Sequence, residues 1–162
     1  MRCLLIDKII TCEKGSRITG IKNVTMSEKF LQDHFPGFPV MPGVLQLEAV
    51  SQLGSWLIFA TTDFKKKAWI VSVKSLKFKD FIVPGDQMRI ELDLESQSEL
   101  SAIFNAKIFV DSKLKTEVKR GQLSYVDVEE LEDPLKTKEF FDFITGNSPM
   151  GRYKSGKKRG YL

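Results

Sequence analysis

The chain has 162 residues, of which 42% are hydrophobic and 28% are charged, the composition of an ordinary globular domain. Its formal net charge is +4, but five basic residues and no acid lie in residues 146–162, so the rest of the chain is close to neutral. Basic residues confined to a tail argue against a nucleic-acid-binding module. The sequence also lacks a signal peptide, an apolar run long enough to cross a bilayer, a phosphate-binding P-loop and a GxSxG serine elbow.

The cysteine and histidine content limits the redox and metal chemistry. The two cysteines, Cys3 and Cys12, do not resemble a disulfide framework, which favours a reducing cytoplasm. The single histidine, His34, and two separated cysteines do not make a zinc site of the usual ligand types. We therefore expect a cytoplasmic protein without a bound metal.

Hydrophobic patterning predicts strands at both ends of the main body. Residues 3–10 and 17–24 are expected to form a hairpin, with a turn at residues 13–15. Ser27 is expected to cap a short helical turn that ends before His34. Further along the chain, residues 67–78, 88–95, 102–110 and 114–126 read as strands. Residues 88–95 alternate between apolar and charged side chains, as in an antiparallel strand with one solvated face.

The most apolar segment lies between these two groups of strands. Pro42 is suited to open a helix, and residues 44–60 are predicted to form it. Apolar side chains occupy most of its circumference, which places the helix inside a domain or between subunits. The polar exceptions share one narrow sector: Glu48, Ser51, Gln52 and Ser55. The sequence thus predicts an α+β fold, an antiparallel β-sheet wrapped around a long central apolar helix.

The predicted main domain covers residues 1–126, and residues 127–162 form a C-terminal extension. An amphipathic helix is predicted at 134–145 and carries Phe140, Phe141, Phe143 and Ile144, which we expect to pack on the body or on a neighbouring subunit. Residues 146–162 are expected to be a mobile basic tail.

His34 and Glu48 are candidates for an acid–base pair. Histidine gains and loses its proton nearest neutral pH, which suits it to act as a base. Glu48 lies in an apolar helix, so we expect it to be desolvated and to favour the protonated acid. A base and an acid that face one substrate suit an elimination: one removes a proton and the other protonates the leaving hydroxyl. Taken singly, each residue also has a purely structural explanation.

Gly43 is a candidate for binding a substrate carbonyl through its backbone amide. Amides at a helix N-terminus have no intrahelical partners, and the helix dipole favours negative charge there. A carbonyl bound at Gly43 would be polarised, which stabilises the enolate-like charge that follows proton loss.

Residues 34–52, which read HFPGFPVMPGVLQLEAVSQ, resemble the active-site segment of the β-hydroxyacyl-acyl carrier protein dehydratases, the FabZ-like branch of the hotdog fold. The similarity extends over roughly residues 3–126 and includes LLIDKI and FKDFIVPGDQM. The resemblance implies that His34 is the catalytic histidine, that Glu48 is the catalytic acid, and that the Gly43 amide binds the thioester carbonyl. Gln52 is implied as a supporting polar residue. A glutamate at position 48 matches the FabZ branch, whereas the FabA branch has aspartate.

The resemblance also implies the reaction and the partners. The substrate would be a (3R)-hydroxyacyl chain on the phosphopantetheine arm of acyl carrier protein, dehydrated without a cofactor to the trans-2-enoyl form in fatty acid biosynthesis. Members of the family form dimers, often trimers of dimers, in which two subunits share each site. The expected substrate-tunnel residues are Phe35, Phe38, Val40, Met41 and Val44. Acyl carrier proteins are acidic, so Lys65, Lys66, Lys67 or the basic tail are candidates for steering their docking.

Two alternatives remain open from the sequence. A hotdog acyl thioesterase needs an acid near the central helix but not the histidine. A non-catalytic partner subunit of an active paralogue needs only the subunit interface.

Overall fold

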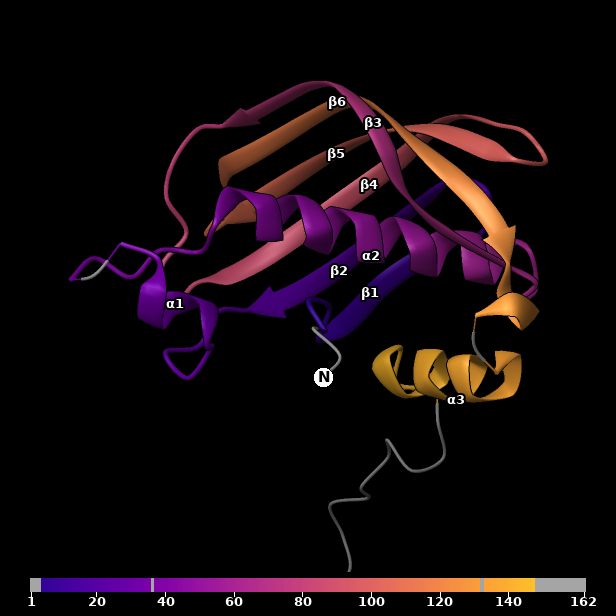
Figure 1. Ribbon diagram of the computed structural model, residues 1–162, viewed down its shortest axis with the longest axis horizontal. Coiled ribbons are helices and arrows are strands. Elements are labelled where there is room, and N and C mark those ends of the chain that lie inside the picture. The colour runs from indigo at the N-terminus through magenta and orange to yellow at the C-terminus, as the bar shows by residue number, and fades with distance from the viewer. Residues whose placement is uncertain (1–3, 36, 132, 148–162) are drawn as a thin grey trace, which may run out of the picture.

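The computed structural model describes residues 4–35, 37–131 and 133–147. A six-stranded antiparallel sheet curls around the long helix α2 (Gly43–Thr61), as Figure 1 shows. In their order across the sheet, the strands are β1 (Lys8–Glu13), β2 (Arg17–Asn23), β4 (Gln87–Gln97), β5 (Ser101–Val110), β6 (Lys113–Asp127) and β3 (Lys66–Phe78). The predicted architecture of a sheet wrapped around a central helix is confirmed.

The core lies between α2 and the concave face of the sheet. Leu53, Leu57 and Ile58 of α2 are fully buried, and so are Ile90 and Leu92 of β4. These residues explain why α2 is apolar around most of its circumference: the sheet curls over it, so several of its sides contact strands. The predicted alternation of β4 is confirmed, because Arg89 and Asp93 on the opposite face are exposed.

The first strand begins later than predicted. Residues 3–10 were expected to form it, but β1 begins at Lys8. The Leu5 amide instead donates a hydrogen bond to Oε1 of Gln52 on α2, at 2.8 Å, and the Leu5 and Ile6 side chains enter the core. An amide bound to a helix side chain is not available for a sheet ladder, so pairing starts only after this contact.

The short helix α1 (Phe30–Asp33) also differs from its prediction. Its N-cap position is Lys29, without a side-chain cap, and the predicted cap Ser27 instead pairs its hydroxyl with that of Thr25 at 2.9 Å. At the start of α2, Pro42 occupies the N-cap and Gly43 is the first helical residue. The helix therefore starts close to the predicted residue.

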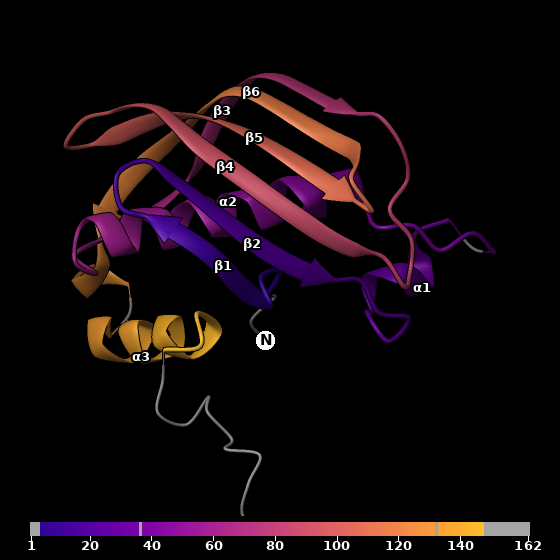
Figure 2. The ribbon, with the colours of Figure 1, turned by 180° about the vertical axis from the view of Figure 1, so that it is seen from behind.

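The chain after β6 forms a single 3₁₀ turn (Val128–Glu130) and the helix α3 (Pro134–Ile144). Figures 1 and 2 place α3 beside the C-terminal half of α2, outside the sheet. Trp56 of α2 contacts both Phe140 and Phe141, with ring centroids 5.8 Å apart in each case. Most of the predicted basic tail lies outside the described residues. Among those described, no helix combines the length and apolar character that crossing a bilayer requires.

Candidate active site

His34 lies directly after α1, at its C-cap, and is half-buried. Its Nδ1 lies 3.0 Å from the carbonyl oxygen of Val40. A carbonyl only accepts, so Nδ1 carries the proton in this hydrogen bond and Nε2 keeps its lone pair. The contact fixes both the tautomer and the orientation that a general base requires.

The residues after His34 form a tight turn with an unusual backbone. Phe35 has φ of 55°, in the left-handed region that a bulky side chain rarely adopts. The Phe38 amide closes the turn by donating to the Phe35 carbonyl at 2.8 Å. The Phe38 ring meets the Phe81 ring edge-on at 5.5 Å, and all three phenylalanines are exposed. Backbone conformations of this kind concentrate at functional sites.

Gly43 is the first residue of α2 and lies against the ring of Phe78. A Cβ at this position would lie 2.6 Å from the tip of the Phe78 ring, so a larger residue would have to displace that ring. The Leu45 and Gln46 amides both donate to the Pro42 carbonyl. As the first helical residue, Gly43 has an amide without an intrahelical acceptor.

A buried polar pair fixes the first turn of α2. Gln46 is 3% exposed and donates from Nε2 to the Met41 carbonyl at 3.3 Å, while its Oε1 accepts from the Thr116 hydroxyl of β6. The Met41 amide in turn donates to the Ile82 carbonyl at 2.8 Å. Sequence reasoning missed Gln46, although a polar residue in so apolar a helix signals a buried partner.

Glu48 faces a cavity of about 520 Å³ between α2, β3 and α3. The expectation that Glu48 is desolvated is wrong for the single chain, where this residue is exposed. The reason is that its sector of α2 lines an open cavity and does not pack on the sheet. The predicted polar sector is confirmed, because Glu48, Ser51, Gln52 and Ser55 all line this cavity.

Hydrogen bonds assign structural roles to three of these four residues. Nε2 of Gln52 donates to Oε1 of Glu48 at 3.0 Å. The hydroxyls of Ser51 and Ser55 accept from the Ile70 and Ala68 amides of β3, at 3.2 and 3.4 Å. β3 is an edge strand, so these contacts occupy edge amides that have no neighbouring strand.

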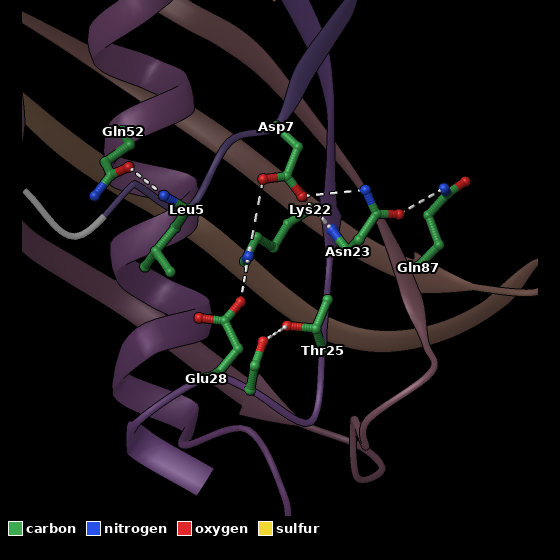
Figure 3. A network of polar contacts seen from close by, with 9 residues as sticks. Leu5, Asp7, Lys22, Asn23, Thr25, Glu28, Gln52 and Gln87 are labelled. Atoms are coloured by element: carbon green, nitrogen blue, oxygen red, sulfur yellow. Dashed lines mark hydrogen bonds and ion pairs between the residues drawn. The ribbon is translucent and has the colours of Figure 1, made fainter.

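An ion cluster around the buried Lys22 lies close to α2, next to the N-terminal segment (Figure 3). Lys22 is 5% exposed, and its ammonium pairs with Glu28 and, at 3.9 Å, with Asp7. Asp7 also accepts from the backbone amide of Asn23 at 2.6 Å. The cluster connects β2 to the segment that leads into α1, and therefore to His34.

The predicted site residues do not all meet within one chain. His34 is not among the residues that line the Glu48 cavity, and neither are Phe35, Phe38, Val40, Met41 and Val44. Val40 and Met41 are buried in the core, whereas Val44 is 73% exposed. Of the candidate docking lysines, Lys67 lines the cavity, Lys66 donates to the Glu99 carbonyl and Lys65 is exposed. No group of three potential metal-binding side chains gathers anywhere in the described part of the chain.

An antiparallel sheet curled around a central helix, with a histidine loop leading into that helix, defines a protein of the hotdog class. The family model of the FabA-like domain matches residues 1–119. FabZ, a 3-hydroxyacyl-(acyl-carrier-protein) dehydratase of Geobacter metallireducens, is 42% identical over 117 residues, which cover 70% of this chain and 78% of that protein. FabZ of Clostridium novyi is 42% identical over 115 residues, covering 70% and 81%. This chain belongs to the FabZ-like dehydratase family of hotdog proteins.

Solved structures of low sequence identity share the fold. The dehydratase heterocomplex ApeI:P from Xenorhabdus doucetiae superimposes with a TM-score of 0.64 at 13% identity, covering 79% of this chain and 86% of that one. A thioesterase from Haemophilus influenzae gives a TM-score of 0.56 at 14% identity, covering 76% and 81%. At these identities the likeness concerns the fold alone.

Proposed function

We propose that this protein removes water from (3R)-hydroxyacyl chains carried on acyl carrier protein and produces the trans-2-enoyl thioester in fatty acid biosynthesis. His34 is the base and Glu48 the acid. The Gly43 amide binds the thioester carbonyl, and Gln52 orients Glu48. The observation that carries the proposal is the Nδ1 contact of His34 with Val40, which leaves Nε2 with the lone pair that proton abstraction requires.

The proposed reaction is an elimination in which His34 removes one proton from the substrate and Glu48 donates one to the leaving group. Nε2 of His34 takes a proton from C2 of the acyl chain, and the negative charge that develops on the carbonyl oxygen is stabilised by the Gly43 amide at the N-terminus of α2. The C2–C3 double bond forms as the bond from C3 to the hydroxyl breaks. Glu48 protonates the departing hydroxide, which leaves as water. The histidine proton then returns to Glu48 through solvent, so the reaction needs neither a metal nor an organic cofactor.

We further propose that two subunits share each site. Glu48 faces a cavity that His34 of its own chain does not line, so a second chain has room to supply the histidine. The cavity opens beside β3, whose exposed Trp69 and Val71 lie on an edge strand of the sheet. Exposed apolar side chains of this kind favour contact with a second copy. In a homodimer, alone or within a trimer of dimers, each active site would then combine Glu48 of one subunit with His34 of the other.

The experiment is conversion of 3-hydroxyacyl-acyl carrier protein by the purified full-length chain, followed as formation of the 2-enoyl thioester. We expect wild type to convert the substrate, and His34→Ala and Glu48→Gln each to lower kcat about a thousandfold. Glu99→Gln, an exposed carboxylate away from the cavity, is the matched control and should retain full activity. If both site variants kept wild-type activity, the assignment would be wrong.

The same assay separates the two alternatives. Release of a free thiol in place of an enoyl product would assign a thioesterase. Absence of turnover by the pure protein, with turnover restored by a homologous chain, would assign a partner subunit. We propose that the reaction takes place in the cytoplasm, where the acidic acyl carrier protein would be steered by Lys67 at the cavity and by the neighbouring Lys65 and Lys66.

A further inference from the structure

The aromatic side chains that line the Glu48 cavity gather at the end away from Glu48. Glu48, Gln52 and Ser51 lie at one end, and the far end carries the aromatic and aliphatic side chains of Trp56, Phe59, Trp69, Leu131 and Phe140. Leu4, Ser55, Lys67, Ala68 and Thr137 complete the lining. Between Glu48 and Phe59 the helix rises about 16 Å, so the two ends are well separated. A volume of about 520 Å³ lies within the range of ligand pockets.

The far wall is built by a segment outside the part of the chain that matches the family model. That match ends at residue 119, whereas Leu131, Thr137 and Phe140 follow it. Thr137 is 7% exposed, and the Phe140 ring lies against Trp56. The wall is therefore an addition to the hotdog body and not one of its strands.

α3 is held firmly enough to serve as a wall. Asp133 caps its N-terminus by accepting from the Leu135 amide at 3.0 Å, and Pro134 occupies the first turn. On the side facing the body, Phe141 contacts both Trp56 and Phe64, and Ile144 is buried. These aromatic contacts fix the helix against the C-terminal half of α2.

We propose that α3 limits the length of the acyl chain that this protein accepts, with Thr137 and Phe140 as the specificity-determining residues. The inference rests on the proposed function. A 3-hydroxyacyl thioester carries its polar groups at one end and an alkyl tail at the other, so the hydroxyl would lie at Glu48 and the tail beside the aromatic rings. With the hydroxyl at Glu48, the tail would extend along α2 towards Trp56 and end against α3. A chain too long for this space would have to displace Phe140.

The test is a profile of kcat/KM over 3-hydroxyacyl-acyl carrier proteins of graded chain length, measured on the full-length protein. Phe140→Ala enlarges the far end, so we expect it to raise kcat/KM for chains longer than the wild-type optimum roughly tenfold relative to that optimum. Thr137→Leu fills the cavity and should shift the optimum to shorter chains. Leu135→Ala is the matched control, because this residue lies on α3, is 74% exposed and does not line the cavity.

The outcomes separate this inference from the function on which it rests. If wild type forms enoyl product and the profiles of Phe140→Ala and Thr137→Leu superimpose on the wild-type profile, α3 does not set chain length, although the dehydratase stands. If wild type forms no enoyl product at any chain length, the proposed function itself fails. Should Phe140→Ala not fold, Thr137→Leu decides alone, because it fills the cavity without removing an aromatic contact of α3: a shift to shorter chains supports the inference and an unchanged optimum overturns it.

Discussion

Gln52 joins Glu48 to the N-terminal segment of the chain. Its amide nitrogen donates to Glu48 at 3.0 Å, and its amide oxygen accepts from the Leu5 backbone at 2.8 Å. The Gln52 side chain therefore orients the proposed acid, Glu48. It also supplies the hydrogen-bond acceptor that the Leu5 amide would otherwise find in a neighbouring strand.

Replacing Gln52 should affect stability and catalysis together. Gln52→Ala leaves the Leu5 amide without this acceptor, which should lower the free energy of unfolding by about 1–2 kcal/mol. It also removes the hydrogen bond that orients Glu48, so kcat should fall while KM changes little. Urea denaturation and steady-state kinetics measure the two effects. Gln97→Ala, at an exposed position of β4, should change neither. Unchanged kcat in Gln52→Ala would assign this residue a purely structural role.

Removing the buried cation from the ion cluster around Lys22 should lower the stability of the fold. Lys22→Met leaves Glu28 without its cation, and we expect it to lower the free energy of unfolding by about 3 kcal/mol. The double variant Lys22→Met/Glu28→Gln should recover most of this loss, because the less exposed of the two carboxylates is then neutral and the Asp7 carboxylate is partly solvated. Urea denaturation at neutral pH measures both. A loss below about 1 kcal/mol in the single variant would contradict the role we assign to the cluster.

A side chain at position 43 should interfere with the Phe78 ring. In Gly43→Ala the new Cβ would overlap the Phe78 ring and displace the first turn of α2. We expect kcat/KM to fall about a hundredfold, the effect of losing one oxyanion donor. Adding Phe78→Ala removes the clash and should restore much of the activity, which a double-mutant cycle with Phe78→Ala alone quantifies. A fully additive cycle would contradict the steric explanation.

Tyr125 should make stability sensitive to alkaline pH. Its hydroxyl is buried without a hydrogen-bond partner among the described residues, and burial raises the pKa of this tyrosine from 10.0 to about 12. Between these two pH values the unfolded chain loses the proton and the folded chain keeps it, so stability should fall as pH rises from 10 to about 12.

Tyr125→Phe should remove this contribution to the pH dependence. Below pH 10 it should also stabilise the fold by about 1 kcal/mol, because an unsatisfied buried hydroxyl is replaced by an apolar edge. Chemical denaturation of both proteins from pH 8 to 12 provides the measurement. Equal slopes for wild type and variant above pH 10 would show that Tyr125 does not carry the effect.

The fold was predictable where local periodicity determines it. The apolar circumference of α2 and the alternation of β4 each reflect a repeating environment, so a window of sequence suffices to identify the element. The polar sector of α2 was predictable for the same reason, since helical spacing alone brings Glu48, Ser51 and Gln52 to one side.

The remainder depends on contacts between distant parts of the chain. The start of β1 is set by Gln52, which lies 47 positions after Leu5, and the role of Gln46 depends on Thr116, 70 positions away. No local pattern contains such partners. The exposure of Glu48 depends on how β3 and α3 are placed relative to α2, and the spacing of residues along α2 alone does not predict that placement. The same holds for α3, whose phenylalanines predicted packing but not the cavity that they help to close.

Subunit complementation tests the central claim, that His34 and Glu48 from different chains form each site. His34→Ala and Glu48→Gln proteins are each expected to be inactive as homodimers. When equal amounts are unfolded together and refolded, a mixed dimer contains one site with both substitutions and one intact site. Random pairing should therefore restore about a quarter of the wild-type rate of enoyl formation. A mixed pool no more active than either variant alone would contradict the account, because sites built within one chain would all remain damaged.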